Sequence, residues 1–312
     1  MYKYIFGPVP SRRLGVSLGV DLVMSKTCNL DCIYCECGST TKFYNTRDSY
    51  IDIDIDRLIG EVEDILQNLT PDYITFSGSG EPTLNKDLGI IIKKVRKIYS
   101  GKIAVITNSS LLNNLGVREA LEEADLIIPS LDAISEDGFK RINRPIEGLS
   151  IKDILDGMTK FLSTTKKEVY LEIFIVEGIN DGVEELEKFV EYLKDKKITV
   201  IQLNTLARPG AIKEIKPASM KRLSEIKDFF INHGLDSVEI IKKYTSREEF
   251  PKYSEKLEKL ILNMLAKRKY SIHEMVELLQ RNEVELFKYL NILQKEGKVK
   301  IVIENDQIYI KS

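Results

Sequence analysis

Apolar positions in the first 245 residues alternate between a spacing typical of buried strands and one typical of amphipathic helices. Short apolar runs predict strands over 16–23, 72–76, 102–107, 126–131, 168–176 and 199–203. Helical periodicity follows each strand, over 53–69, 88–99, 117–123, 151–163, 183–194 and 218–232. Repeated strand–helix units predict a parallel sheet with right-handed crossovers. We therefore expect an α/β fold, a partial TIM-like (β/α)6 barrel over residues 1–245, with its chemistry at the carboxyl ends of the strands.

The two ends of the chain depart from this pattern. Residues 1–15 contain prolines and glycines close together, at Gly7, Pro8, Pro10 and Gly15, and we expect an irregular segment there. A charge-rich joint over 245–252 is followed by helical patterns over 254–267, 271–279 and 283–296. Apolar alternation over 299–304 and 307–311 then predicts a hairpin. Three helices and a hairpin predict a small winged-helix-like domain over 253–312.

The charge of this small domain argues against DNA binding. Residues 251–312 hold 12 Lys/Arg and 9 Asp/Glu, a net charge of 12 − 9 = +3, which is only a weak basic bias. The third predicted helix begins with Glu283 and Glu285, and acidic side chains there would meet phosphates badly. We expect substrate capture, dimerisation or a lid function rather than sequence-specific DNA recognition.

Composition changes the picture only slightly. A length of 312 residues allows one large and one small domain, and the net charge of −2 gives no general attraction to nucleic acid or membrane. No apolar run approaches membrane-spanning length. All four cysteines, Cys28, Cys32, Cys35 and Cys37, fall in one loop, which suits a reducing cytoplasm.

The spacing of Cys28, Cys32 and Cys35, Cys-x3-Cys-x2-Cys, is the strongest chemical signal in the chain. Thiolates this close on one loop can hold an iron–sulfur cluster, and three of them leave one iron of a 4Fe–4S cluster open to a ligand. Zinc is the alternative. It requires a fourth ligand, which Cys37 would supply from a cramped position, because both histidines lie far along the chain.

This loop, with Tyr34 directly before its third cysteine, resembles the signature of the radical S-adenosylmethionine (SAM) superfamily. Residues 77–84, after the second predicted strand, resemble the Gly-Gly-Glu-Pro segment of that family, with Ser79 replacing one glycine. The resemblance implies a 4Fe–4S cluster on the three cysteines and a bound SAM. The SAM-binding residues that it implies are Tyr34, Gly78, Ser79, Gly80, Glu81 and Pro82. A glycine-rich strand-to-helix turn would look similar without binding anything.

Polar residues at other strand ends are further candidates for SAM binding. Asn108, Ser130, Asp132 and Asn204 are placed to contact the ribose, the methionine carboxylate or the adenine. Each could equally serve as a turn or helix-cap residue. Residues 177–181 resemble a family segment near the adenine, and could likewise hold only a helix cap. Glu172 is a candidate acid–base residue if it faces the barrel interior.

The segment from residue 7 through the cysteine loop resembles an uncharacterised radical SAM group that is distantly similar to wyosine-forming tRNA enzymes. The resemblance covers about residues 1–245 and implies cleavage of SAM to a 5′-deoxyadenosyl radical that abstracts hydrogen from a substrate. It also implies an external one-electron reductant of the flavodoxin or ferredoxin type. Cysteines are confined to positions 28–37, so we expect one cluster, not the second cluster of the wyosine-forming enzymes.

The sequence leaves the substrate open. The resemblance favours a nucleoside or tRNA, whereas the near-neutral charge and the acidic third helix favour a small metabolite or peptide. A cluster-bearing regulator that binds DNA is a third possibility. Arg12 and Arg13 could clamp a carboxylate or phosphate of the substrate or SAM, or lie solvated on the surface.

Overall fold

A computed structural model gives the fold of the chain. It describes residues 2–23, 25–44, 46–47, 52–67, 69–241, 257–279, 286, 289–290, 293–294, 296–304 and 307–311. The predicted joint at 245–252, most of the predicted third helix at 283–296, and the proposed domain boundary at 253 lie outside these ranges.

The strands of the barrel follow one another across the sheet in the order of the sequence. The described part of the chain contains an eight-stranded sheet in the order β1-β2-β5-β6-β7-β8-β9-β10. Its strands are β1 (Ile5–Ser11), β2 (Gly15–Val20), β5 (Tyr73–Phe76), β6 (Lys102–Thr107), β7 (Leu126–Pro129), β8 (Glu168–Phe174), β9 (Val200–Asn204) and β10 (Val238–Ile240). From β2 to β10 all neighbours are parallel, whereas β1 runs antiparallel to β2. The predicted strands are all present, and the α/β partial-barrel expectation is confirmed.

The prediction of an irregular segment over residues 1–15 is wrong, because the chain forms β1 there. Proline is tolerated in this strand because β1 lies at the edge of the sheet, where one row of N–H groups needs no partner. The pairing with β2 shifts register between Phe6 and Val9, and Gly7 has a φ of 101° at that irregularity. The sequence pattern also missed β10, which is only three residues long.

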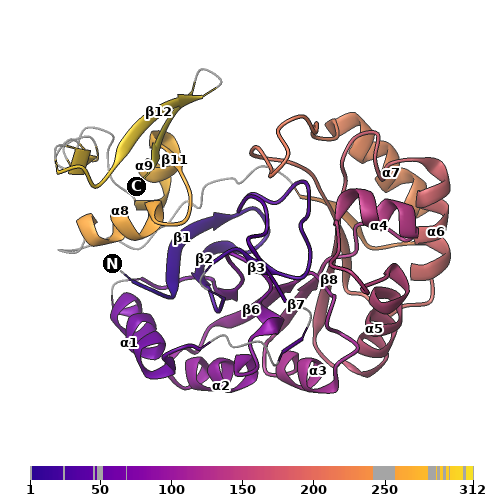
Figure 1. Ribbon diagram of the computed structural model, residues 1–312, viewed down its shortest axis with the longest axis horizontal. Coiled ribbons are helices and arrows are strands. Elements are labelled where there is room, and N and C mark those ends of the chain that lie inside the picture. Colours follow the sequence, from indigo (N-terminus) through magenta and orange to yellow (C-terminus); the bar gives the residue numbers. More distant parts are fainter. Residues whose placement is uncertain are drawn as a thin grey trace.

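Helices surround the sheet on its outer side (Figure 1). They are α1 (Ile55–Leu66), α2 (Leu88–Ile98), α3 (Leu115–Leu121), α4 (Glu136–Ile142), α5 (Ile151–Thr164), α6 (Val183–Leu193) and α7 (Met220–Asn232). α1 begins at Ile55 because the Asp54 side chain accepts a hydrogen bond from the Arg57 amide and caps the helix. Leu58 and Val62 of α1 are fully buried, and each such burial contributes about 1.5–3 kcal/mol. α4 was not predicted, because its seven residues include only two apolar side chains, Phe139 and Ile142, and a glycine, so no period is visible.

The C-terminal unit forms a small antiparallel sheet with helices packed beside it. It contains α8 (Leu257–Leu265), β11 (Tyr270–Ser271), α9 (Ile272–Leu279), β12 (Lys300–Glu304) and β13 (Gln307–Lys311), with strand order β11-β13-β12. The predicted hairpin is confirmed by the pairing of β12 with β13. A winged helix also requires the third helix, so that assignment stays a prediction.

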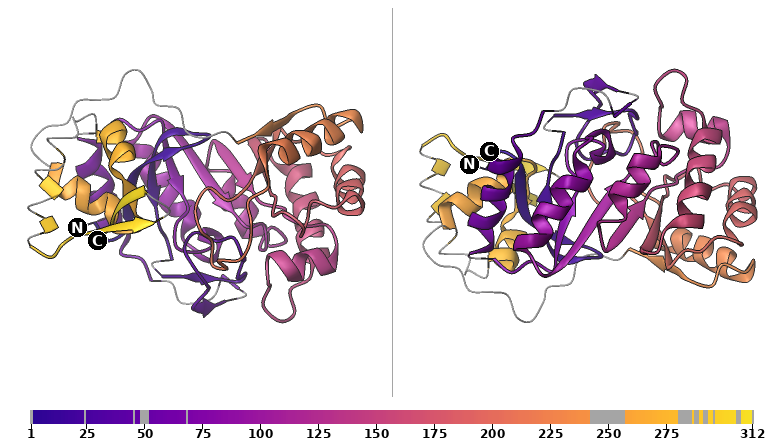
Figure 2. Two further views of the ribbon diagram at one scale, coloured as in Figure 1. Left: turned by 90° about the horizontal axis from the view of Figure 1, so that it is seen from above. Right: turned by 90° about the horizontal axis from the view of Figure 1, so that it is seen from below.

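This unit packs against the edge of the barrel at β1, at the opposite end of the molecule from α6 and α7 (Figures 1 and 2). The Asn263 amide donates to the carbonyl oxygen of Gly7 at 3.1 Å, and the Tyr270 hydroxyl donates to that of Pro8 at 3.4 Å. Lys259 pairs with Asp64 of α1 at 2.9 Å. No helix in the described residues is long and apolar enough to cross a membrane.

Candidate active site

The cysteine loop is held by the chain segment that follows α4. It begins at the short strand β3 (Thr27–Cys28), which pairs with β4 (Lys42–Phe43). The amide of Asp31 donates to the carbonyl of Asn143 at 2.9 Å, and the amide of Ile33 donates to that of Ile142 at 3.0 Å. An ion pair between Asp31 and Arg144 at 2.9 Å closes the contact. The three predicted ligands therefore sit on a backbone fixed by tertiary contacts.

A nitrogen donor from the protein faces each of the three cysteine sulfurs. The Asn108 amide donates to Cys28 Sγ at 3.3 Å, and the Asn143 amide donates to Cys32 Sγ at 3.4 Å. Lys26 Nζ donates to Cys35 Sγ at 2.9 Å. Such donors stabilise negative charge on sulfur, as thiolate ligands of an iron–sulfur cluster require.

The free thiols differ in acidity. A hydrogen bond from Cys37 lowers the pKa of Cys35 to about 5, assisted by the Lys26 ammonium. Burial raises the pKa of Cys28 to about 11, and burial also raises the pKa of Cys32. The exposed Cys37 thiol can donate its hydrogen either to Cys35 or to the Gly78 carbonyl, which lies at 3.3 Å. Cys35 is thus the thiol best prepared to bind a metal as a thiolate.

The donor set fits an iron–sulfur cluster. In the described residues no three His, Cys, Asp or Glu side chains are arranged to hold one metal ion. A 4Fe–4S cluster binds each thiolate on a different iron, so its ligands need not converge on one point. Three thiols on one loop, each with its own donor, match that requirement.

The glycine-rich loop after β5 packs directly on the start of the cysteine loop. A Cβ atom on Gly80 would lie 1.7 Å from the carbonyl oxygen of Thr27, so only glycine fits. The amide of Glu81 donates to that same oxygen at 3.1 Å. Gly78, with a φ of 135°, also passes close to Asp21, although less closely, and a Cβ there would lie 2.7 Å from Cγ. The loop of residues 78–82 is therefore set in place by its contacts with residues 21 and 27.

The carboxylate of Glu81, one of the SAM-binding residues that the resemblance implies, accepts four hydrogen bonds from the protein itself. It is buried and accepts from the Thr83 amide at 3.0 Å and the Thr83 hydroxyl at 2.6 Å. The Thr107 hydroxyl and the Asn108 amide each donate to it at 2.7 Å. Three of these donors reach Oε1 and only the Asn108 amide reaches Oε2, so Oε2 keeps capacity for a further hydrogen bond. Glu81 also caps a 3-10 helix (Pro82–Leu84) that begins with the predicted site residue Pro82.

Asp132 and Tyr34, two further predicted SAM contacts, bind each other. The Tyr34 hydroxyl donates to Asp132 at 2.5 Å, and the Asn143 amide donates to the same oxygen at 2.8 Å. The Phe174 amide donates to the other oxygen at 3.0 Å, and the Phe174 ring stacks on Tyr34 with centroids 3.8 Å apart. Burial raises the pKa of Asp132 to about 6, despite these donors.

The remaining candidates lie along the same strand ends. Asn108 also donates to Asn29 at 2.9 Å. The carbonyl of the half-buried Ser130 accepts from the Ser109 hydroxyl at 2.7 Å. Asn204 donates to the buried Glu172 at 3.1 Å. Ser79 binds Asp21 through both its amide and its hydroxyl.

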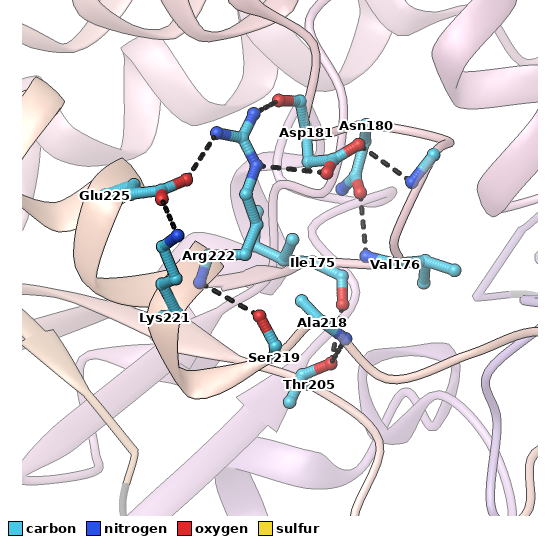
Figure 3. Close-up of polar contacts among 11 residues, drawn as sticks. Ile175, Val176, Asn180, Asp181, Thr205, Ala218, Ser219, Lys221, Arg222 and Glu225 are labelled. Carbon is cyan, nitrogen blue, oxygen red and sulfur yellow. Dashed lines mark hydrogen bonds and ion pairs between the residues drawn. The ribbon is translucent and has the colours of Figure 1, made fainter.

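The segment 177–181 braces the loops after β8 and β9 (Figure 3). The buried Asn180 accepts from the Val176 amide at 2.8 Å and donates to the Asp132 carbonyl at 2.7 Å. Asp181 pairs with Arg222 of α7 at 3.1 Å, and Arg222 also contacts Glu225. In this structure the segment therefore holds the backbone of Asp132 in place through Asn180.

A cavity of about 910 Å³ lies between the barrel and the C-terminal unit. Its barrel side includes Ser17, Thr75 and Ile106, from β2, β5 and β6. Its other side includes Arg268 and Tyr309 of the C-terminal unit. Arg12, Arg13, Glu36, Arg208, His273, Glu274 and Glu277 also line it.

Arg208 joins the cysteine loop to the C-terminal unit across this cavity. It pairs with Glu36, one residue after Cys35, at 3.3 Å, and with Glu274 of α9 at 2.7 Å. A second contact reaches the glycine-rich loop, because Lys267 binds both Asp21 and, at 3.3 Å, the Ser79 hydroxyl. Burial raises the pKa of Asp21, but the Lys267 ammonium outweighs this and brings the pKa below its ordinary value.

Sequence reasoning missed several of these residues. Lys26 and Asn143 both donate to cysteine sulfurs. Asn143 lies 111 positions from Cys32, so no local sequence pattern predicts the contact between them. Lys267 and Arg208 gain their contacts only when the C-terminal unit packs on the barrel. Lys26 alone carried a signal, since a cation near a group of cysteines favours a thiolate, although it donates to Cys35 and not to the nearer Cys28.

Comparison with known proteins agrees with this geometry. The model of the Radical SAM superfamily matches residues 22–193. A UPF0026 protein of Methanocaldococcus jannaschii is 34% identical over 310 residues, which are 98% of this chain and 95% of that protein. A protein named GTPase Obg from Brachyspira hyodysenteriae is 35% identical over 304 residues, 97% of this chain, which spans only 44% of that relative.

A solved structure of TYW1 with a lysine-pyruvate adduct bound has the same fold. It aligns with a TM-score of 0.52 and 18% identity, over 71% of this chain and 74% of that chain. At this identity the likeness shows the fold alone. Cysteine spacing, barrel and family match coincide on the same residues, and the chain belongs to the radical SAM superfamily of enzymes.

Proposed function

We propose that Cys28, Cys32 and Cys35 bind one 4Fe–4S cluster, that SAM binds beside it, and that the protein abstracts hydrogen from a substrate held in the cavity. The observation that supports this most is the pairing of each cysteine sulfur with its own nitrogen donor, on a loop packed against Gly80. When bound and reduced by an external one-electron donor, the cluster and SAM supply a 5′-deoxyadenosyl radical.

The chain's own residues would position and shield this chemistry. Gly78 and Gly80 bring backbone groups close to the cysteine loop, where a ligand of the open iron would lie. Because four groups of the protein donate to the Glu81 carboxylate, we propose that it fixes this loop, while its Oε2, which has one donor, keeps capacity to accept from SAM. Asn108, Ser130, Asp132 and Asn204 border the same end of the barrel, and Tyr34 binds Asp132 there.

The size of the cavity favours a small substrate over a macromolecule. Small-molecule sites typically enclose about 300–1,000 Å³, and the cavity between the barrel and the C-terminal unit measures about 910 Å³. The expectation of a nucleoside within tRNA depends on family resemblance. We therefore propose a free small molecule, and treat activity on tRNA as the competing outcome.

The test is an anaerobic assay of SAM cleavage. The purified chain is reconstituted with iron and sulfide, reduced with dithionite, and supplied with SAM, and 5′-deoxyadenosine is measured by mass spectrometry. We expect slow formation by the wild type and none by Cys32→Ala. Bound zinc with no 5′-deoxyadenosine would overturn the proposal.

Cys37→Ala is the matched variant on the same loop. If Cys37 is not a ligand, this variant should bind as much iron as the wild type and still form 5′-deoxyadenosine. Loss of the cluster in Cys37→Ala would instead make Cys37 a fourth ligand. If Cys37 donates a hydrogen atom to the substrate radical late in the reaction, Cys37→Ala should cleave SAM as the wild type does but form less product, once the substrate is known.

A further inference from the structure

Most charged side chains that line the cavity are paired with one another. Arg13 pairs with Glu172, and Arg208 pairs with both Glu36 and Glu274. His273 and Glu277 form a pair at 3.4 Å. Of the residues that the structure describes, four arginines and three glutamates line the cavity, and Glu277 faces a cation in its pair only when His273 is protonated. The lining therefore carries a small excess of positive charge, to which Arg12 and Arg268 contribute.

Arg268 has two buried donors with nothing to bind. Its Nε and Nη2 atoms are inaccessible to solvent and have no hydrogen-bond partner in the part of the chain that the structure describes. Its guanidinium carbon lies 4.3 Å from the centre of the Tyr270 ring, which fixes the plane of the group. Nε and Nη2 are the donors on one edge of the guanidinium, the edge that grips a carboxylate or phosphate through two parallel hydrogen bonds.

Arg12 adds a second positive charge to the same cavity. Burial lowers its pKa, although Glu36 and Glu172 act in the opposite direction. Those two carboxylates already bind Arg208 and Arg13. A buried cation whose nearest anions are engaged elsewhere attracts a further anion from solution.

We propose that this cavity recognises a small substrate through an oxyanion group, a phosphate or a carboxylate, which Arg12 neutralises and which Arg268 grips once a rotation of its side chain turns the buried Nε and Nη2 edge toward the cavity. This proposal deepens the proposed function and rests on it for the identification of the ligand as the substrate. Because Arg268 belongs to the C-terminal unit and Arg12 to the barrel, such a ligand would bind both at once.

The rest of the cavity fits a molecule that is polar at one end only. Ser17 and Thr75 face it with hydroxyl groups, which bind each other at 2.6 Å. Phe6, Leu14 and Ile106 supply apolar surface. An anionic head with a less polar body therefore matches the lining better than a uniformly charged polymer does.

The test measures oxyanion binding to the full-length protein by isothermal titration calorimetry. The probes are inorganic phosphate, pyrophosphate and malonate, which separate a phosphate source from a carboxylate source. We expect at least one probe to bind the wild type with a Kd below about 1 mM. Arg268→Gln should weaken that binding about tenfold or more, and Arg12→Gln should weaken it less.

Two further variants make the result specific. Arg268→Lys keeps the charge but loses the two-donor edge, so it should fall between the wild type and Arg268→Gln. Arg141→Gln removes an exposed arginine of α4 outside the cavity and should bind as the wild type does. Thermal unfolding of each variant confirms that it is folded.

The outcomes distinguish this inference from the proposed function. Equal binding by the wild type and Arg268→Gln, or no binding of any probe, overturns the inference even if 5′-deoxyadenosine forms. Arg268-dependent binding in a protein that forms no 5′-deoxyadenosine supports an oxyanion site and removes the radical reaction. Binding of tRNA that is lost in Arg268→Gln, with no binding of the small probes, would overturn the small-molecule assignment.

Discussion

The cysteine end of the barrel and the cavity beside the C-terminal unit use polar side chains in opposite ways. At the cysteine end, the oxygens of Glu81 and Asp132 accept hydrogen bonds from several groups of the protein itself. In the cavity, Arg268 keeps two donors without a partner. The hydrogen bonds of the first region form without a ligand, whereas the donors of the second region are those that we propose a ligand completes.

The energetic difference between the regions is large enough to matter. A buried donor left without a partner costs about 1–3 kcal/mol, a sizeable part of the stability of a domain. A satisfied carboxylate at the cysteine end incurs no such cost. Removing a polar group should therefore harm the first region and leave the second nearly unaffected.

The largest effect is expected for Gly80→Ala. The new methyl group would lie on the Thr27 carbonyl, a backbone atom that cannot rotate away, and the two loops would have to separate. We expect a loss of at least about 3 kcal/mol of stability, little bound iron and no 5′-deoxyadenosine. Iron content and thermal unfolding measure the change.

Gly60→Ala is the control for that substitution. Gly60 lies in α1 with no atom within 4 Å of an added Cβ, and alanine there should stabilise the helix by about 0.5–1 kcal/mol. Normal iron binding by Gly80→Ala would show that the close contact is dispensable.

Lys267→Met tests the contact between the C-terminal unit and the glycine-rich loop. Asp21 is fully buried and Lys267 is 28% exposed, so the substitution leaves a buried carboxylate without its cation. We expect a loss of about 2 kcal/mol, less than for a fully buried pair because Lys267 keeps some contact with water. Denaturant unfolding at neutral pH measures it.

Lys259→Met is matched to it, since Lys259 joins the same unit to α1 through the more exposed Asp64. Its cost should stay below about 1 kcal/mol. Equal losses for the two variants would mean that the Asp21 contact contributes no more than a surface ion pair.

Asp132→Asn tests the cysteine end of the barrel through the pH dependence of its stability. The folded-state pKa of Asp132 is raised to about 6, above that of the unfolded chain, so the folded state binds this proton more tightly. The associated stability is present at low pH and is lost as the pH rises through that value. The difference between the unfolding free energies of wild type and variant should fall by about 1 kcal/mol from about pH 5 to about pH 7.5. A difference that is constant with pH would contradict the shift.

The smallest effect is expected for Arg268→Gln without ligand. Loss of the contact with Tyr270 is offset by removal of unsatisfied donors, so stability should change by less than about 1 kcal/mol. A much larger loss would mean that Arg268 supports the structure, and the contrast between the two regions would then fail.

The sequence predicts the framework of the barrel well because buried strands and amphipathic helices leave a period along the chain. β1 escaped prediction because its prolines are compatible with a strand only at an edge, and edge position is a property of the finished sheet. α4 has only two apolar side chains, and β10 is only three residues long, so neither establishes a period.

The residues of the candidate site also fall into two groups, those that a local sequence pattern predicts and those that only packing brings together. The three cysteines lie within one short stretch and the glycine-rich loop is contiguous, so each is visible as a local pattern of the sequence. The partners of Glu81 come partly from Thr107 on the next strand, and those of Cys32 from Asn143 beyond α4, so their roles depend on packing. Arg268 depends on the docking of a separate unit, which no local pattern encodes.

The contacts that Asn263 and Tyr270 make with the carbonyls of Gly7 and Pro8 have a consequence for solubility. β1 is an edge strand, and a strand edge with free backbone groups readily pairs with another chain. By occupying acceptors on that strand, α8 and the residues after it block such pairing. Shortened forms of the protein that lack this unit should aggregate through β1, so the unit protects the barrel as well as enclosing its cavity.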